Sequence, residues 1–299
     1  MDVVEPGPRA PAMLVRRKDA GYPPLLSSIH DPPEALHVRG NPAALLQPHL
    51  AIVGSRRASS AGLRLASQLA GGLADAGLVV CSGLALGIDG AAHAGALAAG
   101  GVTVAIMATG IDTVYPRRHR ALAARLAEKG CLVTEFPPGT PPRREHFPQR
   151  NRIISGLSLG VLVVEATPGS GSLITARAAL EQGREVFALP WSALHQGGRG
   201  CLQLLRDGAK MVERVEDVLE ELGPLYRLHS EALSTARVDP TAADMVAPSP
   251  LLRLIGFETT SLDQLVTDSG TPVADVLREL AALELSGVVA RVPGGYIRC

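Results

Sequence analysis

The sequence has few aromatic residues, few cysteines and no excess of either charge, and each shortage excludes a class of protein. Its 29 Lys and Arg residues balance its 29 Asp and Glu residues, so the whole chain is not a general polyanion binder, and any nucleic-acid site must come from local clustering. The four cysteines are scattered without a CxxC spacing. This distribution predicts free thiols in a reducing cytoplasm and no metal site.

Long hydrophobic runs are also missing. No apolar run reaches the roughly 20 residues that a membrane-spanning helix requires. The first residues, MDVVEP, are acidic and contain proline, unlike a secretory signal. We therefore expect a cytoplasmic protein with no membrane partner.

The sequence does contain a repeated alternation of short apolar runs and helical patterns. The runs are typical of strands buried on both faces of a parallel sheet, and they lie at residues 50–53, 78–81, 102–106, 131–134, 161–164 and 186–189. Helical patterns lie between them at residues 61–76, 90–99, 119–129 and 173–182, followed by a short strand at 210–212 and a closing helix at 215–222. This alternation predicts an α/β fold with a doubly wound, mostly parallel sheet.

The α/β pattern occupies residues 49–222, and the flanking segments differ from it. Residues 1–48 are rich in proline and predict an irregular lead-in, and residues 223–248 resemble a linker. In residues 249–299 three short helices are expected at 251–255, 261–266 and 273–285, and a hairpin is expected from 288–292 and 296–297. Three helices followed by a hairpin predict a small C-terminal winged-helix-like domain.

Glycine turns follow three of the predicted strands. They read Gly54-Ser55-Arg56 after the first strand, SGLALG at residues 82–87 after the second, and GSGS at residues 169–172. The carboxyl ends of parallel strands line the edge of a sheet where ligands bind. Glycines there allow close approach of the backbone to phosphate, and helix N–H groups hold the anion. The turns therefore predict a phosphate-binding site.

Arginine is concentrated in the segments near this edge. Between residues 115 and 152, nine Lys and Arg residues face only three Glu residues. Because arginine suits bidentate contacts with phosphate, we expect Arg56, Arg150 and Arg152 to converge with backbone amides on one anion-binding notch. A solvated basic face is the commoner explanation for any single arginine, but the cluster beside three glycine turns favours phosphate. Asp89 and His93 lie one helical turn apart, and we expect them to act as polar scaffolding.

Several long motifs are similar to those of the DprA/Smf family of DNA-processing proteins. They are SGLALGIDGAAH at residues 82–93, FPQRNRIISGLS at 147–158, VVEA at 163–166, GSLITA at 171–176 and ALEQGR at 179–184. The resemblance implies an extended Rossmann-like domain that binds single-stranded DNA without strong sequence preference. It also implies that the chain protects this DNA, hands it to the RecA recombinase during DNA uptake and recombination, and pairs as a homodimer.

The same resemblance places the DNA-binding residues. It implies contacts from Gly54, Ser55, Arg56, Gly83, Gly87, Phe147, Arg150, Asn151 and Arg152, with Gly171 and Ser172 at the border. No cofactor, metal or catalytic residue is implied. Because aromatic residues make up only 3% of the chain, Phe147 is the best candidate for stacking on a base, with a core position as the equal alternative. Affinity should therefore depend mainly on phosphate contacts and weaken with salt.

An enzyme is the alternative from another class. Residues 168–172, PGSGS, resemble the start of the motif of lysine-decarboxylase-like phosphoribohydrolases, but Thr175 stands at the position of their catalytic glutamate and supplies no carboxylate. The first turn lacks the GxGxxG of NAD-dependent dehydrogenases. In the tail, Arg278 is outnumbered by Asp275, Glu279 and Glu284, so we expect protein docking or regulation there and no strong grip on duplex DNA.

Overall fold

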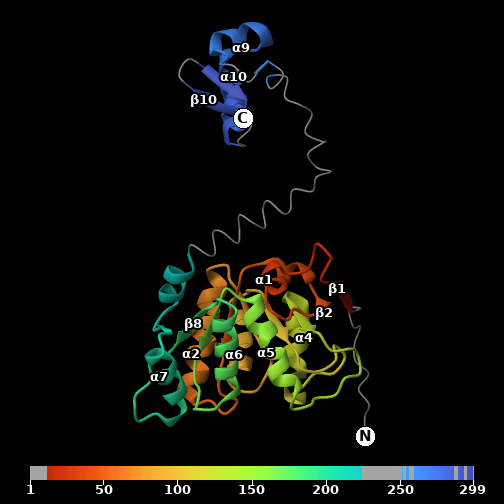
Figure 1. Cartoon of the computed structure of the whole chain (residues 1–299), viewed down its shortest axis with the longest axis vertical. Helices are drawn as coiled ribbons and strands as arrows, with labels where there is room; N and C mark the ends of the chain where they lie inside the picture. Colours follow the sequence, from red (N-terminus) through yellow and green to blue (C-terminus); the bar gives the residue numbers. More distant parts are fainter. Residues whose placement is uncertain are drawn as a thin grey trace. The chain divides into compact units, whose positions relative to one another are not determined.

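The computed structural model describes residues 12–223, 251, 254–255, 259–285, 289–292 and 295–298. The chain divides into two compact units, Met1–Leu233 and Ser234–Cys299, which are taken here one at a time (Figure 1). In the described part of the chain no helix is both long enough and apolar enough to cross a bilayer.

A nine-stranded sheet forms the centre of the first unit, in the order β1-β2-β6-β5-β4-β3-β7-β8-β9. Every neighbouring pair from β6 to β9 in this order is parallel. The parallel strands are β3 (His49–Val53), β4 (Val79–Ser82), β5 (Thr103–Ile106), β6 (Cys131–Thr134), β7 (Gly160–Val163), β8 (Glu185–Ala188) and β9 (Lys210–Met211). The predicted mostly parallel, doubly wound sheet is confirmed. The chain runs from β3 outward to β6 and then returns to place β7 on the other side of β3, so the topological switch point lies between β3 and β7.

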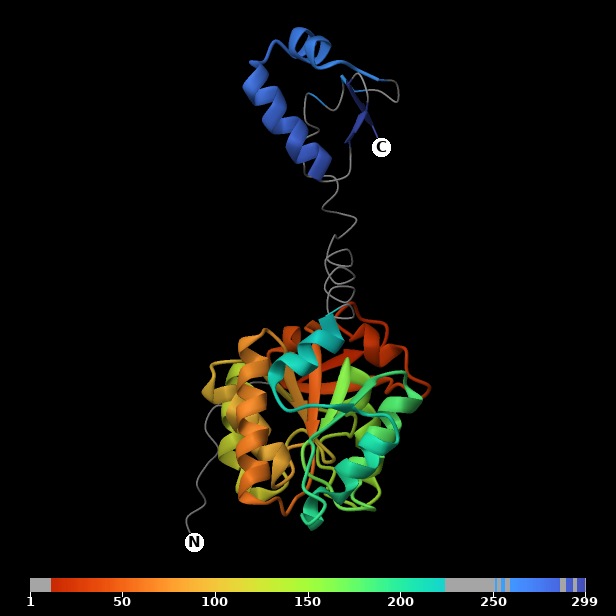
Figure 2. The same ribbon diagram turned by 90° about the vertical axis from the view of Figure 1, so that its left-hand side faces the viewer.

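Helices cover both faces of this sheet (Figure 2). One face packs against α2 (Ser60–Asp75), α3 (Ile88–Ala98) and residues 215–223, with α4 (Arg120–Lys129) beside them. The other face packs against α1 (Pro24–Ser27), α5 (His146–Leu157), α6 (Gly171–Glu181) and α7 (Arg199–Arg206). Because side chains alternate along a strand, Leu50 and Ile52 of β3 face the first group, whereas Ala51 and Val53 face the second.

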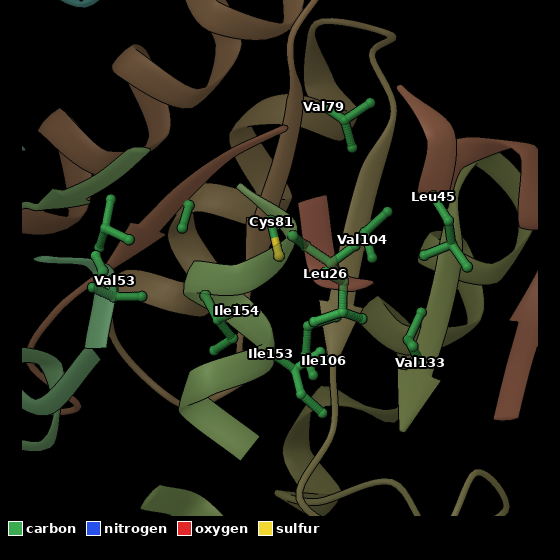
Figure 3. Close-up of a cluster of buried hydrophobic side chains, with 14 of the residues drawn as sticks. Leu26, Leu45, Val53, Val79, Cys81, Val104, Ile106, Val133, Ile153 and Ile154 are labelled. Carbon is green, nitrogen blue, oxygen red and sulfur yellow. The ribbon is translucent and has the colours of Figure 1, made fainter. Parts of the chain in front are cut away.

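The second core shows why the central strands read as continuous apolar runs. Figure 3 shows side chains of β4, β5 and β6 meeting Ile153 and Ile154 of α5 and Leu26 of α1. All of these side chains are at most 1% exposed. Since both faces of each strand are buried, both sets of alternating positions must be apolar.

The predicted irregular lead-in is wrong for much of residues 1–48. This stretch contains β1 (Met13–Arg16), α1, β2 (Ala35–Gly40) and a 3₁₀ turn, η1 (Pro42–Leu46), and β2 pairs antiparallel with β6. The prolines lie where regular structure tolerates them: Pro24 and Pro42 begin α1 and η1, and Pro32 and Pro33 precede β2. A proline in the first turn removes only an N–H that has no helical partner.

Helix α5 was absent from the predicted elements. Its centre carries Arg150, Asn151 and Arg152, which interrupt the apolar pattern, and Pro148 lies in its first turn. The remaining helices were predicted close to their observed bounds, as were the parallel strands.

The second unit contains α9 (Leu262–Ser269), α10 (Val273–Leu285) and a hairpin of β10 (Val289–Val292) with β11 (Gly295–Arg298). The Ser261 hydroxyl accepts a hydrogen bond from the Gln264 amide, so the predicted N-cap is confirmed. A small core lies between these elements and includes Leu265, Leu280 and Tyr296. The predicted linker at 223–248 lies almost wholly outside the described residues, and the predicted helix at 251–255 lies partly outside them.

Candidate functional site

A cavity of about 760 Å³ opens at the switch point between β3 and β7. This volume is within the range of small-ligand sites, about 300–1,000 Å³. The wall is built from the turn after β3, one side of α5 and the turn into α6, and it includes Gly54, Ser55, Arg56, Arg57, Phe147, Arg150, Asn151, Glu165, Thr167, Ser170, Gly171, Ser172 and Thr175. Eight of the eleven predicted site residues are in this wall, because three parallel strands deliver their turns to the same edge.

The turn after β3 is fixed by close backbone packing. A Cβ on Gly54 would lie 2.6 Å from Ile88 Cγ1 and 2.8 Å from the Glu165 carbonyl oxygen. Gly87 has φ +79° and precedes α3, and a Cβ there would overlap the Ser55 carbonyl oxygen. The Ser55 amide donates to the Glu165 carbonyl over 2.7 Å. Gly87 therefore supports the wall from behind rather than lining it, and only glycine allows this approach.

Arg56 and Arg57 stand exposed at the rim of the cavity. The Arg56 guanidinium lies over the Phe147 ring, with Cζ 4.8 Å from the ring centroid. Within the described residues neither arginine forms an ion pair. Two cations held at the mouth of the cavity without a carboxylate partner are available to an incoming anion.

Arg150 contributes its charge from inside the wall. It is 3% exposed and lies beneath Gly83, and its Nη1 donates to the Ile106 carbonyl. Burial lowers the pKa of Arg150 to about 10, while the nearby Asp89 carboxylate opposes this shift. Burial also raises the pKa of Asp89, and the Arg150 charge opposes that shift. Arg150 therefore stays cationic at neutral pH.

The expectation that Arg152 joins Arg56 and Arg150 is wrong. Arg152 is outside the cavity wall: its Nη2 lies 2.5 Å from Glu135 Oε2, and its Nε lies 3.3 Å from Asp31 Oδ2. Residues two apart on a helix do not face the same way, so α5 can aim only one of these arginines at the cavity. Arg152 is held by internal carboxylates and joins α5 to segments beside β2 and β6.

The amino end of α6 supplies polar groups without charge. Ser170 is its N-cap, yet its hydroxyl bonds to the Ser172 hydroxyl over 2.7 Å and caps no backbone amide. Asn151 Nδ2 donates to the Gly171 carbonyl over 3.3 Å, and a Cβ on Gly171 would meet open space. Because the first amides of a helix lack helical partners and carry partial positive charge, this end of the cavity favours an anion.

Glu165 is a wall residue whose role the sequence did not reveal. Its carboxylate is 2% exposed and accepts hydrogen bonds from the Ser59 amide and hydroxyl, at 3.1 and 2.7 Å. The Ser59 hydroxyl in turn caps α2 by accepting from the Gly62 amide. His195 Nε2 lies 3.7 Å from Glu165 Oε1. A carboxylate directly after a buried strand was the available signal.

Asp89 and His93 occupy separate networks. Asp89 Oδ2 accepts hydrogen bonds from the Gly83 and Ala85 amides, which fixes the second glycine turn. The Thr103 hydroxyl donates to the Val80 carbonyl, so it accepts from His93 Nδ1 across 2.7 Å, and His93 Nε2 is the unprotonated nitrogen. Burial lowers the pKa of His93 to about 3. Both side chains thus serve the shape of the β4–α3 turn and α3.

Metal ligation is not apparent in the described ranges: no group of three or more His, Cys, Asp or Glu residues is placed to hold an ion. Cys81, Cys131 and Cys201 are free and buried. Burial raises the pKa of the Cys81 and Cys201 thiols to about 12, so they stay protonated. Cys299 lies outside the described residues.

Comparison with known proteins identifies similar chains for both units. The family described as DNA recombination-mediator protein A matches residues 13–223, and the DprA winged helix domain matches residues 235–295. Protein Smf of Escherichia coli (strain K12) is 48% identical over 281 residues, which cover 93% of this chain and 75% of that protein.

Solved structures agree with the sequence matches. The X-ray structure of DNA processing protein A from Streptococcus pneumoniae has a TM-score of 0.68 and 44% identity, covering 70% of this chain and 74% of that one. A structure of DNA processing protein A from Helicobacter pylori, reported for its single-stranded DNA binding mode, has a TM-score of 0.65 and 27% identity. It covers 73% of this chain and 99% of that one.

Proposed function

The chain belongs to the DNA recombination-mediator protein A family, also called DprA/Smf, and from this premise we propose that its switch-point cavity binds the phosphates of single-stranded DNA. The observation that carries the proposal is the meeting of three positive elements in one cavity. They are the unpaired guanidiniums of Arg56 and Arg57, the buried cation Arg150, and the amino end of α6.

Each element suits a phosphate diester better than a neutral ligand. Exposed guanidiniums offer bidentate contacts to phosphate oxygens, and helix amides add donors that need no counter-charge. The formal net charge is zero, so attraction comes from this local cluster. Of the residues first assigned to DNA, Gly54, Ser55, Arg56, Phe147, Asn151, Gly171 and Ser172 are proposed as contacts, with Gly83, Gly87 and Arg150 as their support.

The wider role follows from the family. We propose that the chain protects single-stranded DNA and loads RecA during DNA uptake and recombination, acts as a homodimer in the cytoplasm, and has no catalytic step. Thr175, which stands where a phosphoribohydrolase would carry its glutamate, is 2% exposed, and its hydroxyl is directed to the Gly171 carbonyl. This leaves the hydrolase alternative without its carboxylate at that position.

A binding assay over a salt series tests the proposal. Single- and double-stranded oligonucleotides of one sequence are compared by fluorescence anisotropy and gel shift. We expect tighter binding of the single strand, with a log–log salt slope of about −0.7 per phosphate contacted. Equal affinity for the duplex, or turnover of nucleotides by the wild type, would overturn it. A RecA ATPase assay on DNA covered by single-strand-binding protein tests the loading role separately, and we expect a shorter lag.

A further inference from the structure

Tyr115 is an aromatic side chain left in solvent. It is 46% exposed, and it is the only aromatic residue among the exposed large hydrophobic side chains of the described part. The chain has few aromatic residues, and aromatic rings contribute large apolar areas when they are buried. A ring kept at the surface beside a binding cavity is therefore available to a ligand.

Tyr115 lines a second cavity that adjoins the first. This cavity has a volume of about 100 Å³, well below the size of a whole small-ligand site. It shares Arg56, Ala85 and Phe147 with the larger cavity. Its own walls are mostly apolar and come from Leu86, Ala108, Thr109, Tyr115 and Pro116, with Gly83 completing them. The space suits one ring system attached to a ligand that lies in the larger cavity.

The rings around this second cavity are arranged in pairs. The Tyr115 and Phe147 centroids lie 6.0 Å apart with an interplanar angle of 61°, an edge-to-face contact. The Arg56 guanidinium covers Phe147 from the side of the larger cavity's rim. A flat ring that enters thus meets Tyr115 together with the Arg56–Phe147 pair, and both aromatic rings and guanidinium planes stack on nucleobases.

Few groups in the second cavity can read a base edge. The Thr109 hydroxyl donates to the Thr113 carbonyl over 2.6 Å, and the Gly83 amide donates to Asp89. Stacking without hydrogen-bond readout accepts any base, because every base has a π-face.

We propose that this second cavity, between Tyr115 and the Arg56–Phe147 pair, holds one unstacked nucleobase of the bound strand while the adjoining phosphate lies in the larger cavity. The inference rests on the proposed function and adds Tyr115 as the stacking residue. Arg56, which lines both cavities, contacts phosphate and base at their boundary.

Two oligonucleotides of equal length test the proposal by fluorescence anisotropy: oligo-dT and a fully abasic analogue with the same phosphates. Tyr115→Ala is compared with Ile174→Ala, which removes a side chain of similar exposure, 47%, from the wall of the larger cavity only. We expect Tyr115→Ala to weaken oligo-dT binding about 5- to 150-fold. It should leave the abasic analogue and the salt slope unchanged, and Tyr115→Phe should restore affinity for oligo-dT.

The outcomes separate the two proposals. If the wild type binds neither oligonucleotide, the proposed function itself fails. If the wild type binds both equally, or if Tyr115→Ala weakens both equally, phosphate binding stands and the base site is rejected. A loss for oligo-dT in Ile174→Ala as large as in Tyr115→Ala also rejects it. Thermal unfolding of each variant checks that the fold is intact.

Discussion

At the scale of single residues, Arg152 joins three segments that are distant in sequence. It is paired with Asp31 before β2 and with Glu135 after β6, and the Arg152 and Glu135 side chains are only 18% and 11% exposed. We expect Arg152→Ala to lower the free energy of unfolding by about 3 kcal/mol, because it leaves a mostly buried carboxylate without its partner.

Denaturant unfolding measures this loss, and anisotropy measures DNA affinity on the same samples. Affinity for single-stranded DNA should be unchanged under native conditions. The matched control is Arg125→Ala on the exposed surface of α4, which should alter stability by no more than about 0.5 kcal/mol. A variant that folds as well as the wild type but no longer binds DNA would return Arg152 to the binding site.

His93 gives stability a dependence on pH. Its pKa is lowered by burial from 6.5 to about 3, so the unfolded chain takes up a proton below pH 6.5 that the folded chain refuses. The contribution of neutral His93 is fully present above pH 6.5 and is lost as the pH falls toward 3, at about 1.4 kcal/mol per pH unit.

The variant His93→Gln isolates this effect, since its amide can still donate to Thr103 and does not titrate. The difference in unfolding free energy between wild type and variant should change with pH below 6.5 and stay constant above it. The buried carboxylates Asp89 and Glu135, whose pKa values are raised, contribute equally to both proteins and cancel. Parallel curves throughout the range would contradict the assignment.

At the scale of elements, the contact of α2 with α3 depends on small residues. Gly95 on α3 lies against the backbone of Ser67 on α2, and a Cβ there would overlap the Ser67 oxygen and lie 2.7 Å from its Cα. Gly71 on α2 faces the same contact with more room, because its nearest neighbour would be 3.6 Å away.

These two glycines form a matched pair for alanine substitution. Gly95→Ala should destabilise the first unit by about 1–3 kcal/mol, since backbone must move to admit the methyl group. Gly71→Ala should be neutral or stabilise by up to about 1 kcal/mol through helix propensity. Thermal and denaturant unfolding measure both, and an equal effect of the two substitutions would contradict the packing described here.

The elements also show what could be predicted from the sequence. Strands β3 to β8 were predictable because burial on both faces makes each an unbroken apolar run. Strand β2 was hidden by the prolines around it, and α5 by the charged residues at its centre. The three glycine turns and Arg56 were predictable from their place after strands. The direction of Arg152 was not, because it depends on the helical phase of an element that the pattern had not revealed.

At the scale of the whole molecule, the two units carry different charge patterns. In α10 the Arg278 guanidinium is paired with Asp275 over 2.8 Å, so it is not free for phosphate. We expect deletion of residues 249–299 to leave the single-strand dissociation constant and its salt slope unchanged, while any effect appears in assays with protein partners. Anisotropy with full-length and shortened chains measures this, and a collapse of single-strand affinity would assign DNA contacts to the tail.

The central claim, that DNA phosphates bind at the β3–β7 switch point, is tested most directly by the salt dependence of Arg56→Ala. Single-stranded oligonucleotide affinity is measured from low to high salt for wild type, Arg56→Ala and Arg206→Ala, an exposed arginine at the far end of α7. We predict weaker binding and a log–log slope shallower by about 0.7 for Arg56→Ala, with Arg206→Ala matching the wild type. Identical affinity and slope for wild type and Arg56→Ala would contradict the account.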